Sequence, residues 1–143
     1  MNNATMARVV AVAAERGLTV MSHAEDREIS PWDYRLAENI ETVRNGLLAE
    51  YFGTRLHMCH VSTKESVDMV RQSRRRGAMV SCEETPHHLW FDDSRLQYKV
   101  NPPIRKADDV AALVTAIKDG TVSCIGTDHA PHSAADKASG AAG

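Results

Sequence analysis

Four times along the chain, an amphipathic helical pattern is followed by a glycine and then by a short, strongly apolar stretch. The glycines stand where a helix would end in a left-handed cap, at Gly17, Gly53, Gly77 and Gly120. Helix and strand alternating in this way predict parallel strands joined by right-handed crossovers. The strands are too continuously apolar to have a solvated face, which indicates that both faces of the sheet are covered.

The predicted helices carry apolar side chains at steps of three and four residues. The clearest pattern puts one apolar face on the second helix, made of Leu36, Ile40, Val43, Leu47 and Tyr51. The third helix opens with a capping box, in which Ser62 caps the helix and Glu65 reaches back to it. The helices are predicted over 5–16, 32–52, 62–76 and 107–118, and the strands over 18–23, 55–61, 78–83 and 122–127.

A segment of about 20 residues, 84–105, breaks this rhythm and is rich in histidine and proline. It carries too many apolar residues to be plainly disordered. A doubly wound sheet and a β/α barrel both fit the overall pattern, although no glycine-rich phosphate-binding loop follows any strand. The residues alone therefore predict an α/β fold with about four parallel strands and leave these two architectures open.

Composition narrows the class of protein. The chain has 143 residues, a formal charge of -2, 43% hydrophobic and 25% charged residues, as expected for one soluble domain without a basic face for nucleic acid. No apolar run approaches the ~20 residues of a membrane span, and the N-terminus lacks a signal layout, so we expect a cytoplasmic protein. Cys59, Cys82 and Cys124 form no CxxC pair and are predicted to be packed, reduced thiols rather than zinc ligands.

Three of the predicted strands end in residues that bind metals. His23, His60 and Asp128 each stand at the last inward position of a strand. Side-chain alternation then places Leu56 and Met58 on the face of His60, and turns His57 and Cys59 to the other face, which makes His57 a structural histidine. Imidazole and carboxylate suit Zn²⁺ in a hydrolytic site, where three such ligands leave one position open for water.

The strings at these positions resemble a known family. They are HAED at 23–26, HMCHVST at 57–63, TPHHL at 85–89, VNPPIR at 100–105 and GTDHAPH at 126–132. In order and approximate spacing, from about residue 1 to 137, they resemble the later half of a dihydroorotase of the amidohydrolase superfamily. The resemblance implies a partial (β/α)8 TIM-type barrel, of which this chain supplies the fifth to eighth strands.

The resemblance also implies an activity, the interconversion of dihydroorotate and N-carbamoyl-aspartate in pyrimidine biosynthesis. By this match His23 and His60 bind one of two catalytic metals, usually zinc, while Asp128 binds the other and shuttles the proton. Asn101 and His132 match positions that contact the small-molecule substrate. A divalent cation lowers the pKa of bound water to about 7 and so provides a nucleophile for the ring amide.

Two family features are not found in the sequence. No HxH pair followed by arginine precedes His23, and no strand offers the bridging carboxylate. We therefore expect a fragment, with a partial barrel domain over 1–137 and a flexible small-residue tail over 138–143. Such a chain should bind zinc weakly or not at all, show no useful turnover, and associate with itself or with a missing N-terminal half.

Three alternative interpretations stay open at this stage. The fold is shared by allantoinases and hydantoinases, although TPHHL together with GTDHAPH is more similar to dihydroorotase. A non-catalytic chain that assembles with a transcarbamoylase would have no need of His23, His60, Asp128, Asn101 and His132. A doubly wound binding domain would leave the repeated strand-end ligands unexplained.

Overall fold

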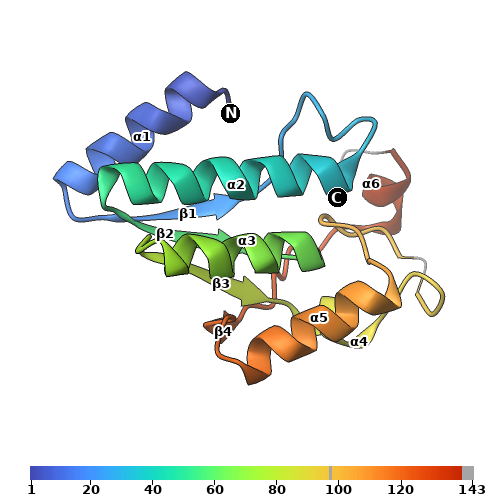
Figure 1. Cartoon of the computed structure of the whole chain (residues 1–143). Coiled ribbons are helices and arrows are strands. Elements are labelled where there is room, and N and C mark those ends of the chain that lie inside the picture. Colours follow the sequence, from blue (N-terminus) through green and yellow to red (C-terminus); the bar gives the residue numbers. More distant parts are fainter. Residues whose placement is uncertain (97, 140–143) are drawn as a thin grey trace.

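Four parallel strands form one sheet in the order β1-β2-β3-β4, with helices packed along it (Figure 1). The computed structural model describes residues 1–96 and 98–139. The strands are β1 (Thr19–His23), β2 (Arg55–Cys59), β3 (Val80–Glu84) and β4 (Cys124–Ile125). The helices are α1 (Asn3–Glu15), α2 (Tyr34–Phe52), α3 (Lys64–Arg75), α4 (Pro86–Trp90), α5 (Ala107–Lys118) and α6 (Ala134–Ser139).

The alternation of helix and parallel strand confirms the predicted α/β class. Each of the four glycines that were expected to end a helix has a positive φ, for example 61° at Gly53. Among the described residues, no helix has the length and apolar composition needed to cross a bilayer. Residues 138 and 139 of the predicted tail belong to α6, and residues 140–143 lie outside the described residues.

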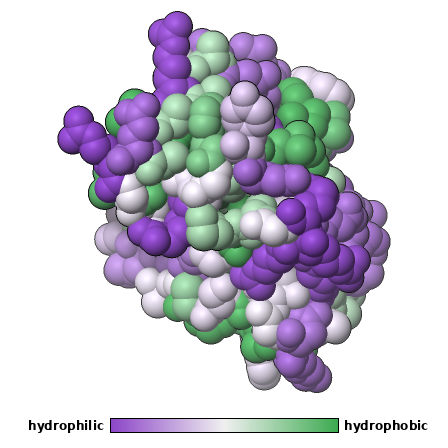
Figure 2. Space-filling view, turned by 60° about the vertical axis from the view of Figure 1, so that its left-hand side comes forward, coloured by the Kyte–Doolittle hydropathy of each residue, from purple (hydrophilic) through white to green (hydrophobic). Residues whose placement is uncertain are grey.

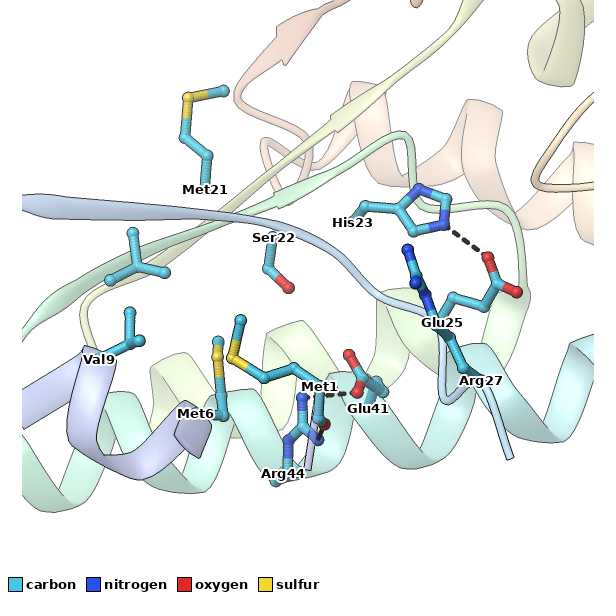
Figure 3. Close-up of a pocket in the computed structure, with 11 residues that line it drawn as sticks. Met1, Met6, Val9, Met21, Ser22, His23, Glu25, Arg27, Glu41 and Arg44 are labelled. Atoms are coloured by element: carbon cyan, nitrogen blue, oxygen red, sulfur yellow. Dashed lines mark hydrogen bonds and ion pairs between the residues drawn. The ribbon is translucent and has the colours of Figure 1, made fainter. Parts of the chain in front are cut away.

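The core lies between the sheet and the helices. Side chains of β1 alternate between the two faces, so that Ser22 is buried towards the helices while Met21 points the opposite way and is 67% exposed (Figure 3). The face turned away from the helices is therefore open in the described chain, and the expectation that both faces are covered is wrong. The core cluster comprises Met6, Val10, Ala49, Leu56, Met58, Val61, Val67, Val70, Ala78, Val80, Cys82, Leu113 and Ala116.

Side chains of β2 alternate as predicted, but the expectation that Leu56 and Met58 share the face of His60 is wrong. Leu56 and Met58 are buried against the helices, whereas His57 and Cys59 lie on the open face of the sheet. His60 follows the strand with a φ of 35°, a left-handed conformation that rotates its side chain away from the strand's alternation. Period-two reasoning cannot be extended to His60, because that residue has already left the strand.

Helix α2 buries the face opposite to the predicted one. Its apolar stripe is exposed, with Leu47 52% and Tyr51 82% accessible, while polar residues such as Glu38 and Asn45 are buried. The surface is accordingly a mosaic in which hydrophobic patches interrupt hydrophilic ones (Figure 2). The buried polar groups are hydrogen-bonded to distant segments, as when Asn45 Nδ2 donates to Ser22 Oγ at 2.9 Å.

Because α2 buries its polar face, we expect substitutions on that face to destabilise the chain more than substitutions in its exposed apolar stripe. We expect Asn45→Ala to lower the free energy of unfolding by about 1–3 kcal/mol, because it leaves the Ser22 hydroxyl unpaired in a buried position. The matched variant Leu47→Ala should change it by only about 0.5 kcal/mol, since Leu47 is exposed. Urea unfolding of both variants is the measurement, and a larger loss for Leu47→Ala would mean that α2 is turned the other way.

Three local expectations are corrected by the structure. Thr63, not Ser62, is the N-cap of α3, and its side chain accepts from Ser66 N. Glu65 does not reach back to a cap but pairs with Arg35 on α2 at 2.5 Å. Of the three thiols, only Cys82 is buried, while Cys59 is half-buried and Cys124 is exposed on the two-residue strand β4.

Candidate metal and substrate site

A cavity of about 260 Å³ lies where the carboxyl ends of the strands meet, the place where parallel α/β folds carry their chemistry. It is lined by side chains from the ends of β1 and β2, from α4, from the loop before α5 and from the segment after β4. All five residues singled out from the sequence contribute to it, together with His87 and three others. The lining residues are His23, His60, His87, Val100, Asn101, Asp128, Ala130, His132 and Lys137.

The two histidines at the ends of β1 and β2 are in direct contact. His23 Nδ1 and His60 Nε2 are 2.9 Å apart, and the rings meet edge to face. His60 is buried, and its Nδ1 has no hydrogen-bond partner among the described residues. Burial, reinforced by the neighbouring His23, lowers the pKa of His60, so its imidazole is neutral at physiological pH. Neutral imidazole is the form that binds a metal ion.

On its other side His23 is held by a carboxylate. His23 Nε2 lies 2.8 Å from Glu25 Oε2, as the dashed line in Figure 3 shows. The same carboxylate accepts from Asn101 Nδ2 at 2.9 Å. Burial alone would raise the pKa of Glu25, but the hydrogen bonds from His23 and Asn101 lower it to about 2. An ionised Glu25 therefore orients the His23 ring, as carboxylates commonly do for ligand histidines.

Asp128 stands on another side of the cavity, after β4. Its φ is 48°, a left-handed conformation that is uncommon outside glycine, and its side chain is exposed. The ligand atoms of His23, His60 and Asp128 do not all come within 4.8 Å of one another in the described chain. The structure thus brings the three residues to one cavity, with the histidine pair close together and the carboxylate further off.

This donor set fits a divalent cation. In a tetrahedral zinc site with nitrogen bonds of about 2.0–2.1 Å, two ligand nitrogens stand roughly 3.3 Å apart. The His23 and His60 nitrogens are already 2.9 Å apart, so a slight separation would admit an ion between them. Their chemistry agrees as well, since imidazole nitrogens and a carboxylate oxygen are the usual ligands of hydrolytic zinc. The role of His23, His60 and Asp128 as ligands stays a prediction.

Asn101 and His132 lie on the cavity wall, but both have partners. Asn101 donates to Glu25, and His132 Nδ1 lies 2.7 Å from the carbonyl oxygen of Ala130. These contacts use Asn101 Nδ2 and His132 Nδ1, so a substrate could meet Asn101 Oδ1 and His132 Nε2 while both contacts persist. Their assignment to substrate binding likewise stays a prediction.

Two residues of the site were missed from the sequence. Glu25 stands two positions after His23 in the HAED string, and His87 lies in the TPHHL string at the start of α4. Burial lowers the pKa of His87, which favours the neutral form of its imidazole at the cavity. Membership of these strings was the available signal, but strand-end reasoning considered only residues at the tips of strands.

A second cavity, of about 430 Å³, lies beside β1 between α1 and α2, and His23 lines it as well. Figure 3 shows Met6 of α1, Met1 from the residues before α1, and Arg44 of α2 at this cavity, where Arg44 pairs with Glu41 at 2.6 Å. Its lining combines methionine side chains with an ion pair that is already satisfied. It lacks the convergence of imidazoles that marks the first cavity.

Comparison with known proteins gives one consistent result. No family model matches the chain. Curated relatives do: the dihydroorotase of Clostridium botulinum is 44% identical over 142 residues, covering 99% of this chain and 36% of that protein. The dihydroorotase of Trichlorobacter lovleyi is 40% identical over 152 residues, covering 92% of this chain and 36% of that protein. The chain thus spans about a third of the length of these relatives.

Solved structures agree on the fold. A D-hydantoinase (dihydropyrimidinase) from Thermus sp. superposes with a TM-score of 0.89 at 22% identity, over 99% of this chain and 37% of that one. An L-hydantoinase from Arthrobacter aurescens superposes with a TM-score of 0.87 at 26% identity, over 98% of this chain and 36% of that one. The four strands and their helices therefore match a portion of the hydantoinase barrel. Over 92–99% of its length the chain is homologous to dihydroorotases, and it corresponds to about a third of such a protein.

Proposed function

We propose that this chain carries the histidine and aspartate part of the active site of a metal-dependent dihydroorotase, which opens and closes the cyclic amide of dihydroorotate. One observation carries the proposal. His23 Nδ1, at the end of β1, and His60 Nε2, just after β2, approach to 2.9 Å in a cavity that Asp128, Asn101 and His132 also line. Dihydroorotase relatives of 37–47% identity support this choice of substrate.

His23 and His60 would hold one divalent cation, for which zinc is the natural candidate, and Asp128 would contribute to a second. When bound, such an ion lowers the pKa of a water molecule and polarises the amide carbonyl. Asp128 accepts the proton from the attacking water and delivers it to the ring nitrogen that leaves, which suits an exposed carboxylate at the mouth of the cavity. Asn101 and His132 hold the ring and its carboxylate in place.

The rest of such an active site would come from a partner. Further strands of a barrel would pair with the outer strands β1 and β4, and they would then enclose the open face of the sheet. We propose that residues outside this chain, from another segment or another copy, complete the ligand set. By itself the chain is expected to hold zinc weakly in this cavity and to lack useful turnover.

A hydantoinase-type activity is the second candidate, because hydantoinases superpose over nearly the whole chain. Their identity of 22–26% shows the fold alone, whereas the dihydroorotases are closer in sequence. A non-catalytic assembly chain is a third candidate. It is disfavoured by the contact between the two histidines, which a scaffold does not require.

A chimaera tests these candidates. The segment of the Clostridium botulinum dihydroorotase that matches this chain is replaced by residues 1–139, and ring opening is measured with dihydroorotate and with hydantoin. We expect turnover of dihydroorotate, loss of that turnover in His60→Ala, and retention in His57→Ala, a histidine outside the cavity. A folded chimaera that is inactive towards both compounds would favour the scaffold, and one that acts only on hydantoin would favour the second candidate.

A further inference from the structure

We propose that His57, Cys59 and Glu83 form a separate cation site on the open face of the sheet, suited to a zinc-type divalent ion. Their ligand atoms all lie within 4.8 Å of one another, with His57 Nε2 3.3 Å from Glu83 Oε2. None of the three lines the cavity that contains His23 and His60. The site is therefore independent of the function proposed above.

The sheet itself brings these side chains together. His57 and Cys59 are two residues apart on β2, so they project from the same face. On β3, Ser81 is the partner of His57 in the parallel register, and Glu83, two residues further, lies on that face beside Cys59. Two neighbouring strands thus present a nitrogen, a sulfur and an oxygen ligand on a rigid support.

Two contacts fix the orientation of the ligands. Ser81 Oγ lies 2.8 Å from His57 Nδ1 and can accept its hydrogen, which leaves the Nε2 lone pair directed at the group. The Glu83 carboxylate packs against the backbone of Gly126 near β4, where a Cβ would lie only 2.7 Å from its atoms. The absence of a side chain at Gly126 therefore makes room for the carboxylate in this position.

The donor set selects the class of ion. One imidazole, one thiolate and one carboxylate are all zinc ligands, and three of them leave a fourth position for water. A simple ion pair between His57 and Glu83 would explain those two residues but not the thiol of Cys59 in the same group. The side chains of His57 and Glu83 are 14% and 17% exposed, so an ion can reach them from solvent.

Cobalt replaces zinc as the probe in the test, because only a cobalt ion bound to sulfur gives a thiolate charge-transfer absorption band in the near ultraviolet. The catalytic candidates His23, His60 and Asp128 include no sulfur, so this band reports the proposed site alone. We expect the reduced 143-residue chain to develop the band on addition of Co²⁺. Cys59→Ser should lose it.

Cys124→Ser is the matched control. Its thiol is exposed and lies 3.9 Å from Glu83 Oε2, yet it is not one of the three grouped ligands, so the band should persist. X-ray absorption of the zinc-loaded natural chain gives a readout that needs no variant, and should show one sulfur at about 2.3 Å from the metal. The proposal would be overturned if no cobalt band appeared, or if the band survived Cys59→Ser. It would also be overturned if X-ray absorption showed either no sulfur ligand or two sulfur ligands on the zinc.

Discussion

Replacement of Glu38 by alanine is expected to destabilise the chain by about 3–5 kcal/mol, the usual effect of removing one partner from a buried ion pair. The Glu38 carboxylate accepts from the backbone N–H groups of Ser62 and Thr63 at 2.9 and 3.1 Å, and from Arg105 Nη2 at 3.1 Å. The Ser62 hydroxyl donates to it as well. Glu38 and Arg105 side chains are only 5% and 10% exposed, so the groups left behind would stay buried without partners.

The comparison variant is Glu50→Ala. Glu50 also pairs with an arginine, Arg76, at 2.8 Å, but both side chains are about a third or more exposed. Surface ion pairs of this kind contribute at most about 1 kcal/mol. Chemical unfolding of the two variants is the measurement, and equal losses would show that Glu38 is not the buried hub of this network.

The second large effect concerns Glu84, at the end of β3. The residue is fully buried, and neither carboxylate oxygen has a hydrogen-bond partner among the described residues. Burial, aided by the neighbouring Glu38 and Glu83 carboxylates, raises the pKa of Glu84 from 4.5 to about 9. The folded chain therefore keeps the group protonated at pH 7, whereas the unfolded chain ionises it.

The sign of the pH dependence follows from this difference. Between pH 4.5 and about 9 the folded state binds the extra proton, so stability falls as the pH rises through that window. At pH 7 the cost is about 3 kcal/mol, because one pKa unit corresponds to about 1.36 kcal/mol. Glu84→Gln removes the ionisable group, and we expect it to stabilise the chain by about that amount at pH 7 and by little at pH 4.5.

The control for this prediction is Glu15→Gln, at the exposed end of α1, which should leave stability unchanged at both pH values. Urea unfolding at several pH values between 4.5 and 9 gives the measurement. If the advantage of Glu84→Gln did not grow with pH, Glu84 would have to be ionised or hydrogen-bonded in the folded chain.

The order of the four strands and of α1, α2, α3 and α5 could be predicted because a glycine follows each of these helices and each strand is short and apolar, whereas the short helices α4 and α6 were not predicted. The inward face of α2 could not be. A helical period identifies an apolar stripe but not what covers it, and α2 instead buries Glu38 and Asn45, whose partners Ser62 and Ser22 are distant in sequence. Hydrogen bonds between distant segments leave no mark on the local pattern.

The site shows the same division. The positions of His23, His60 and Asp128 at strand ends were enough to predict that these residues lie near one another, and all three line one cavity. The backbone at His60 and Asp128 is left-handed, so the direction of these two side chains does not follow from strand alternation. Alternation counted back from His60 therefore assigned His57 to the wrong face. Glu25 and His87 were missed because they lie on a loop and on a short helix; Glu25 acts through its bonds to His23 and Asn101, and His87 lines the cavity itself.

The central claim is that His23 and His60 hold one cation between them. Zinc anomalous scattering from crystals of the chimaera tests it most directly, because it locates the ion without reference to activity. The account predicts a zinc peak about 2.0–2.1 Å from His23 Nδ1 and from His60 Nε2. A fully loaded chimaera whose zinc ions all lie away from these two nitrogens would contradict it.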